Sequence, residues 1–257
     1  MKYISIFVLT IFFAGLFSCE KNLIEANRQW QFADPTKANL KVINTYTSNI
    51  PAGAPGVGVT RFYVYQDLDK LNGNALSSPG AWPGSATYAS VKPGTTAFNL
   101  ILDRRVGNDY GKPVKGDTAF KGNIPMEANK FYTLFMIGES PTQSLFAIED
   151  KLVEPQENFY AARFINLVVS ATPKPVDVYS RREKKVIAPN LTFKSSTDFI
   201  NIPVSTIGDT LDVRDIGTTK ILYSFANFTP ASRRIYTFYT YGKTGFAVER
   251  LVNYVNK

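Results

Sequence analysis

An internal repeat constrains the fold of this 257-residue chain more than any other feature of its sequence. Four short segments in the N-terminal half match four segments in the C-terminal half, in the same order. The matched pairs are 41–44 with 163–166, 62–65 with 176–179, 131–138 with 235–242, and 146–149 with 246–249. The offset between the copies falls from 122 to 100 residues, so the extra length of the first copy lies in its loops. Each copy has the length of one ordinary domain.

Within each copy, short β-branched and aromatic runs alternate with Gly, Pro, Asn and Asp, and no stretch of helix length has a helical period. Strands are expected near 39–46, 58–65, 86–91, 95–103, 117–123, 130–138 and 144–150, and again near 159–168, 175–180, 184–188, 197–202, 209–214, 219–226, 233–242 and 245–254. About seven strands per hundred residues are typical of an immunoglobulin-like Greek-key sandwich. The sequence therefore predicts an all-β protein with two tandem β-sandwich domains, 39–156 and 157–257.

Each copy places a tyrosine, Tyr132 or Tyr236, near the start of its most apolar strand, just after a polar turn. This placement is typical of a tyrosine corner, in which the hydroxyl group ties the strand back to the preceding turn. An ordinary strand tyrosine without a special bond is the other interpretation. Both alternating faces of the strand are apolar, so we expect it to be central and buried.

The N-terminus has the pattern of an export signal, with Lys2 followed by an apolar run from Ile4 to Phe17 that is short for a membrane span. The end of this run, Leu16 to Cys19, resembles the bacterial lipobox, which implies cleavage of residues 1–18 and lipid attachment to Cys19. Residues 19–38 then form a tether, and the Cys-Glu-Lys-Asn start is similar to lipoproteins of the Bacteroidetes. This resemblance implies the outer membrane, facing either the periplasm or the cell surface. The alternatives are an ordinary cleaved signal with a spare thiol, or a buried N-terminal helix.

The second copy resembles a known bacterial family. Arg163-Phe164-Ile165-Asn166, then the segment 172–179 with its Thr-Pro-Lys-Pro start, then the strand that begins at Ile235 are similar to Domain of Unknown Function 4397. The resemblance covers most of residues 157–257, and it extends to the first copy only through the repeat. It implies a secreted, often lipid-anchored β-sandwich module. It supplies no catalytic residues.

The chain contains no His, which excludes Ser-His-Asp and Cys-His nucleophile systems and His-ligated metal sites. Carboxylate catalysis is the main enzymatic route left, and the candidate groups are Asp67 with Asp69, and Asp209 with Asp212 and Asp215. These side chains would equally well solvate turns, and neither set has the spacing of a recognised calcium loop. We expect no enzymatic activity, no metal and no cofactor.

The second copy carries most of the positive charge, because residues 157–257 contain 14 Lys and Arg against 8 Asp and Glu. Its main cluster, in an expected hairpin turn, consists of Arg181, Arg182, Lys184 and Lys185. Such a cluster favours an acidic glycan or an anionic lipid surface as its partner, although a soluble hairpin tip has the same composition. If the four side chains are exposed, their replacement should cost little stability. Nucleic acid is not an expected partner for a protein outside the cytoplasm.

The long loop 72–87 of the first copy is rich in Gly, Pro and polar residues, so we expect it to be exposed. Trp82 in this loop is a candidate for stacking on a sugar or for contacting a protein partner, unless it folds back over the edge of the sandwich. Together these patterns predict a non-catalytic, lipid-anchored envelope protein that binds glycan or another envelope protein. A passive structural spacer is the main alternative, and a glycan-acting enzyme is the third.

Overall fold

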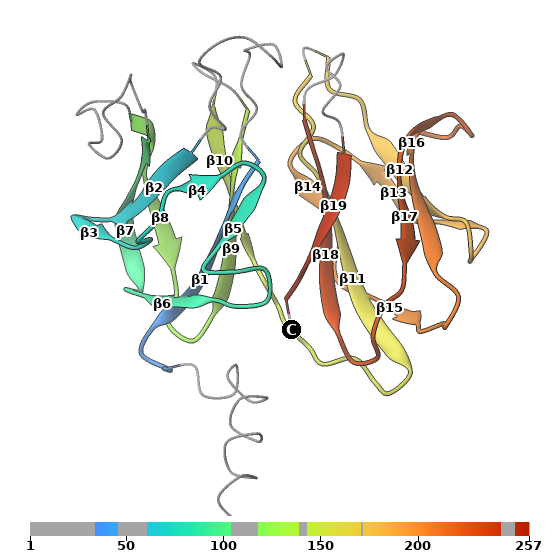
Figure 1. Ribbon diagram of the computed structural model, residues 1–257, viewed down its shortest axis with the longest axis horizontal. Coiled ribbons are helices and arrows are strands. Elements are labelled where there is room, and N and C mark those ends of the chain that lie inside the picture. Colours follow the sequence, from blue (N-terminus) through green and yellow to red (C-terminus); the bar gives the residue numbers. More distant parts are fainter. Residues whose placement is uncertain are drawn as a thin grey trace, which may run out of the picture.

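The computed structural model describes residues 34–45, 61–103, 118–138, 143–170, 172–242 and 250–256. In this part of the chain the regular secondary structure consists of β-strands (Figure 1). The first ten strands are β1 (Ala38–Asn44), β2 (Arg61–Gln66), β3 (Asp69–Lys70), β4 (Leu76–Ser77), β5 (Gly80–Trp82), β6 (Ala89–Val91), β7 (Gly94–Leu102), β8 (Thr118–Met126), β9 (Phe131–Ile137) and β10 (Ser144–Glu149). The other nine are β11 (Phe159–Asn166), β12 (Val176–Ser180), β13 (Lys185–Leu191), β14 (Ser195–Ser196), β15 (Ile200–Pro203), β16 (Asp209–Asp215), β17 (Ile221–Phe228), β18 (Ile235–Tyr241) and β19 (Arg250–Val255).

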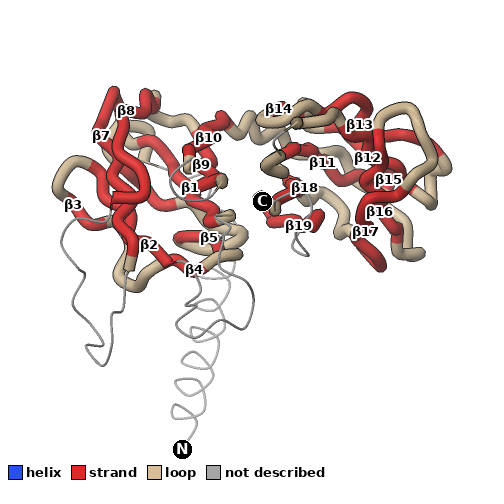
Figure 2. Tube along the Cα trace, turned by 90° about the horizontal axis from the view of Figure 1, so that it is seen from above, coloured by secondary structure: helices blue, strands red, loops and turns tan. Residues whose placement is uncertain are grey.

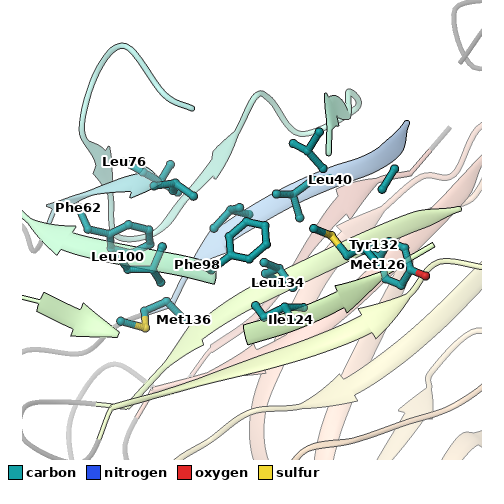
Figure 3. Close-up of a cluster of buried hydrophobic side chains, with 14 of the residues drawn as sticks. Leu40, Phe62, Leu76, Phe98, Leu100, Ile124, Met126, Tyr132, Leu134 and Met136 are labelled. Atoms are coloured by element: carbon teal, nitrogen blue, oxygen red, sulfur yellow. The ribbon is translucent and has the colours of Figure 1, made fainter. Parts of the chain in front are cut away.

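Strands β1 to β10 form the two sheets of the first sandwich. One sheet has the order β10-β9-β1-β5, with β6 also paired to β1, and the other has the order β3-β2-β7-β8, with β4 beside β2. Alternate residues of β2 are buried, as expected for a strand with one face against a core. Figure 3 shows the core that fills the space between the sheets, which includes Leu40, Phe62, Leu76, Phe98, Leu100, Ile124, Met126, Tyr132, Leu134 and Met136.

Strands β11 to β19 form a second sandwich with the same plan. One sheet has the order β14-β11-β18-β19, with β15 also paired to β11, and the other has the order β13-β12-β16-β17. In each sandwich the first strand pairs in parallel with the long apolar strand, so that Lys41 lies opposite Thr133 and Arg163 lies opposite Thr237. The matches of 41–44 with 163–166 and of 131–138 with 235–242 therefore correspond to equivalent positions in space. The match of 146–149 with 246–249 is not seen in the structure, because 246–249 lie outside the described residues, and in strand register Glu149 corresponds to Val255.

The prediction of an all-β chain with two tandem sandwiches is confirmed, and successive strands cross between sheets as in Greek-key folds. The long strands lie close to their expected ranges. The short strands β3, β4, β5 and β14 were not predicted, and β4 and β5 lie inside the segment 72–87 that was expected to be an exposed loop. The expected domain boundary at 154–157 falls between β10 and β11, and the separate folding of the two domains stays a prediction.

The apolar strands β9 and β18 are buried on both faces, as the sequence predicted. On β9, Leu134 points into the core of its own sandwich, whereas Phe135 and Ile137 belong to a different hydrophobic cluster. That cluster includes Ile165 and Tyr239 of the second sandwich. Figure 2 shows why, because the sheet with β1 and β9 faces the sheet with β11, β18 and β19. The second face of each strand is covered by the other sandwich.

Both predicted tyrosine corners are present. The hydroxyl group of Tyr132 accepts a hydrogen bond from the backbone N–H of Glu127 at 3.0 Å, and that of Tyr236 accepts one from Ala231 at 3.1 Å. Each bond joins the start of the strand to the turn five residues before it. The bonds fix where β9 and β18 enter their sheets.

We predict that Tyr132→Phe and Tyr236→Phe each lower the free energy of unfolding by about 1 kcal/mol, because each leaves a backbone N–H of the turn without its acceptor. Denaturant unfolding measures this change. The matched control is Tyr65→Phe, which alters a half-buried tyrosine of β2. Corner variants that unfold at the same denaturant concentration as the control would contradict a stabilising role.

Candidate binding site and domain interface

A pocket of about 280 Å³ lies at one end of the second sandwich. It is formed by the end of β11, the connection to β12, the end of β16 and the start of β17. Its lining residues are Asn166, Val168, Ser170, Thr172, Pro173, Lys174, Val176, Asp215, Lys220, Leu222 and Tyr223. The Thr-Pro-Lys-Pro segment that carries the family resemblance therefore supplies one wall of the pocket.

The turn between β16 and β17, which forms the opposite wall, is held by a buried carboxylate. Asp177 accepts a hydrogen bond from the backbone N–H of Gly217 at 2.9 Å and another from Asn190 at 2.8 Å. Gly217 has a φ of 66°, a left-handed conformation that a glycine adopts without strain. Within the same turn, Lys220 donates to the carboxylate of Asp215 at 2.8 Å. The wall is therefore ordered before any ligand arrives.

The base of the pocket is anchored to β18 through Asn166. The side-chain oxygen of Asn166 accepts a hydrogen bond from the hydroxyl of Thr240 at 2.8 Å, and its amide donates to the carbonyl of Leu191 at 3.0 Å. The backbone N–H of Leu167 also donates to the Thr240 hydroxyl at 3.0 Å. The connection that leaves β11 is thus tied to the centre of its sheet.

The pocket lies at the edge of the molecule opposite to the point where the described chain begins. In Figure 1, β1 and β11 both run from the lower edge to the upper edge, and residues 34–37 lie at the lower edge. The pocket is built around the last residue of β11, so it belongs to the upper edge. Residues 34–37, which precede β1, therefore lie at the opposite edge from the pocket.

The predicted basic cluster lies in the turn between β12 and β13, at the opposite end of β12 from the pocket. The side chains of Lys184 and Lys185 are exposed, and within the described part of the chain neither forms an ion pair. The side chain of Arg182 is only 14% exposed, because it bonds to Glu183 at 3.1 Å and to the carbonyl oxygen of Pro203 at 3.1 Å. The four cations do not form one open patch.

Arg181 has a structural partner that the sequence did not reveal. Its guanidinium group donates two hydrogen bonds from Nε and Nη2 to Asp212, at 2.9 and 2.8 Å, and the Asp212 side chain is fully buried. Burial opposes the charge of Asp212, yet hydrogen bonds from Arg181, Ser224 and Arg214 hold its pKa below the usual value. The four side chains are therefore not all exposed, so the condition under which their replacement was expected to cost little stability is not met. Removal of Arg181 takes a donor from a buried carboxylate.

Trp82 is not an exposed aromatic at a loop tip. It lies in β5, pairs with Val42 of β1, and packs half-buried against the first core. Hydrogen bonds of Asn72 also hold the start of the segment 72–87 against β2. Its side chain accepts from the N–H of Val64 at 2.7 Å and donates to the carbonyl of Asn74 at 2.8 Å. Of the two interpretations, the structure shows the one in which Trp82 covers the edge of the sandwich.

The carboxylates considered for catalysis each contact a different structural partner. Asp67 accepts from the N–H of Ala97 at 3.2 Å, and Asp69 pairs with Lys92 at 2.7 Å. Asp209 accepts from the N–H of Arg182 at 3.0 Å.

Across the described ranges, His, Cys, Asp and Glu form no group of three or more that could hold a metal ion. Cys19 lies outside the described residues, and none of the described segments is a helix long and apolar enough to cross a bilayer.

The two sandwiches are joined by a buried polar network as well as by apolar contacts. Arg163 of β11 forms an ion pair with Asp150 at the end of β10, and the two side chains are 3% and 0% exposed. The same carboxylate accepts hydrogen bonds from the hydroxyls of Thr133 at 2.6 Å and Tyr88 at 2.8 Å. Tyr254 of the second sandwich donates to Thr133 at 3.1 Å. These bonds fix the orientation of one sheet against the other.

Lys41 is fully buried in this interface. Its Nζ donates to the carbonyls of Ser85 at 2.7 Å and Val255 at 3.1 Å, and so bridges the two sandwiches. It also lies over the rings of Tyr88 and Tyr254, 4.3 and 4.4 Å from their centroids. Burial lowers the pKa of Lys41 to about 7, although the nearby charge of Asp150 acts in the opposite direction.

The matching strand register of the two sandwiches explains why Lys41 lacks a carboxylate of its own. Lys41 and Arg163 lie at equivalent positions of the two copies. Asp150 and Asn256 are also equivalent, because each follows the residue opposite a corner tyrosine, Glu149 opposite Tyr132 and Val255 opposite Tyr236. The backbone N–H of Asp150 donates to Phe131, and that of Asn256 donates to Ile235, each at 2.7 Å. The side chains accept in the same way, from the hydroxyl of the threonine on the neighbouring strand. The interface therefore contains two buried cations, Lys41 and Arg163, but only Asp150 as a carboxylate at these equivalent positions. The second copy has the amide of Asn256 where the first copy has an acid.

Comparisons with known proteins add little to this description. No family model and no curated protein matches the sequence. A crystal structure of a provisionally assigned cell adhesion protein from Bacteroides fragilis is 10% identical, over 86% of this chain and 98% of that chain, with a TM-score of 0.18. Likeness at this level carries no argument about function, and the resemblance to Domain of Unknown Function 4397 stays a prediction.

We predict that stability rises with pH between about pH 7 and pH 9 because of Lys41. Its folded pKa of about 7 lies below the ordinary lysine pKa of 10.5, so in this window the unfolded chain binds more protons than the folded one. The contribution is up to about 1.4 kcal/mol per pH unit. Lys41→Met removes the titrating group and should flatten the slope, as measured by denaturant unfolding at several pH values.

Asn256→Asp is the complementary variant, because it restores a carboxylate at the position equivalent to Asp150. It should raise the pKa of Lys41 and reduce the same slope while the lysine is kept. The charged and titratable groups around Lys41 are Asp150, Arg163, Tyr88 and Tyr254, and the window stays below the titration of an ordinary tyrosine. Equal slopes in the wild type and both variants would contradict the assignment.

Proposed function

We propose that this protein is a lipid-anchored component of the bacterial outer membrane that acts by binding and catalyses no reaction, with its ligand in the pocket of the second sandwich. The observation that carries the proposal is the position of the pocket. It opens at the edge opposite to the start of β1, so an anchor attached through the N-terminal segment leaves it directed away from the membrane. The lipobox resemblance around Cys19 supports such an anchor.

The construction of the pocket supports a role in binding. Its walls combine apolar side chains with hydroxyl, amide and charged groups, as ligand sites commonly do. Asp177 holds one wall and Asn166 holds the base of the pocket through hydrogen bonds, so little ordering is needed when a ligand enters. A glycan or a segment of an envelope protein suits such a site.

A passive spacer is the second candidate, and the interface between the sandwiches favours it. A joint with a buried ion pair and a shared hydrophobic cluster keeps the two domains in one orientation, which a spacer of fixed length requires. The same rigidity serves a binding protein by fixing the direction of its pocket. The two candidates therefore differ only in whether the pocket has a ligand.

We predict that Cys19→Ala releases the protein from the membrane, because it removes the lipid attachment site that the lipobox implies. Membrane fractionation of cells that express the variant measures this. A variant that sediments with the outer membrane as the wild type does would contradict the anchor.

We predict that Thr172→Trp abolishes ligand binding, because a large ring at this exposed position of the lining fills the pocket. The probes are neutral and acidic oligosaccharides of defined length, and the measurement is titration calorimetry. Thr206→Trp is the matched control, since Thr206 is an exposed threonine in the connection between β15 and β16, outside the pocket lining. If no probe binds, or if both variants bind like the wild type, the pocket assignment is wrong and the spacer is favoured.

A further inference from the structure

The pocket carries an excess of positive charge. Its charged lining residues are Lys174, Lys220 and Asp215. Lys220 pairs with Asp215 at 2.8 Å, and the two side chains are 70% and 29% exposed. Lys174 is exposed, and in the part of the chain that the structure describes no ion pair involves it. A ligand with one negative charge would balance the lining.

Charge alone does not describe the lining, because part of it is apolar. Val168 and Val176 come from the β11–β12 side and Leu222 and Tyr223 from β17, and Leu222 is 37% exposed. The hydroxyls of Ser170 and Thr172 lie in the same lining. A small inorganic anion would leave these apolar side chains in contact with water. A sugar ring has both C–H faces for apolar side chains and hydroxyls for polar partners.

The volume limits how much of a ligand can enter. At about 280 Å³, the pocket is at the lower end of the range for small-molecule sites, roughly 300–1,000 Å³. This is room for one sugar ring and not for a long stretch of polymer. The site therefore suits a single residue, either free or at the end of a chain.

We infer that the pocket binds a carboxylate-bearing sugar, a uronic acid residue, with Lys174 and Lys220 facing the carboxylate and the apolar side chains of the lining facing the ring. This inference rests on the proposed function of the pocket and adds the class of its ligand. It also moves the acidic-glycan site from the hairpin turn 181–185, where the sequence suggested it, to the other end of the domain. The hairpin cations Lys184 and Lys185 then have no part in it.

The test compares a galacturonic acid trimer with a neutral galactose trimer by titration calorimetry on the full chain. We expect the acidic trimer to bind at least about tenfold more tightly, and to bind more weakly when NaCl rises from about 0.05 M to about 0.3 M. Lys174→Gln with Lys220→Gln should remove this preference. The matched control, Lys184→Gln with Lys185→Gln, removes the same charge from the hairpin and should keep it. Lys174→Gln alone changes an exposed side chain and serves if the double variant does not fold.

The outcomes separate the ligand class from the proposed function. Equal binding of both trimers, abolished by Thr172→Trp, overturns the uronic acid and leaves the binding function in place. Inorganic phosphate that competes as well as the acidic trimer points to a simple anion site and also overturns it. A loss caused by the hairpin variant instead of the pocket variant returns the site to the hairpin. If neither trimer binds, both the ligand class and the glycan-binding function fail.

Discussion

The contact between the two central sheets is the constraint on which the rest of the structure depends. Strands β9 and β18 are apolar on both faces, and an isolated sandwich can bury only one face of a sheet. The second face is covered because Phe135 and Tyr239, from the two copies, pack with ring centroids 5.2 Å apart. The ion pair of Arg163 and Asp150 then fixes the orientation within this contact, since a buried charge tolerates few arrangements.

The repeat produced an interface that is almost, but not fully, symmetric. Each copy contributes a cation on its first strand and a threonine on its apolar strand, yet the carboxylate Asp150 has the amide Asn256 as its counterpart. Arg163 is therefore neutralised and Lys41 is held by carbonyls and aromatic rings. Burial lowers the pKa of Lys41, and the amide at position 256 supplies no negative charge to oppose this shift. A carboxylate at position 256 would give each half of the interface one buried cation and one buried carboxylate.

Several cations of the second domain form ion pairs that stabilise the fold, which the composition alone does not reveal. Arg181 and Arg214 cover the buried carboxylate of Asp212, and Arg182 is bound to its own turn. The exposed cations include Lys184 and Lys185 in the hairpin, Lys174 and Lys220 at the pocket, and Arg233 and Arg234 in the turn between β17 and β18. They are therefore distributed over several places, whereas the charges along the sequence indicated one main cluster in the hairpin. The pocket with Lys174 needs two connections that are about forty residues apart in the chain.

The sequence by itself determined the repeat, the all-β class and most long strands, because these depend on local periodicity and on spacing within one copy. It made Tyr132 and Tyr236 candidates for tyrosine corners, and the structure decided for this interpretation. The sequence also contains the Thr-Pro-Lys-Pro run, which lines the pocket, and two strands without a polar face, which form the interface. Only the tertiary structure decided which residues meet. The partner of Arg163, the burial of Lys41, the position of Trp82 in β5 and the pocket itself arise from contacts between distant segments. Such contacts follow from how the sheets pack, and no local pattern along the chain encodes them.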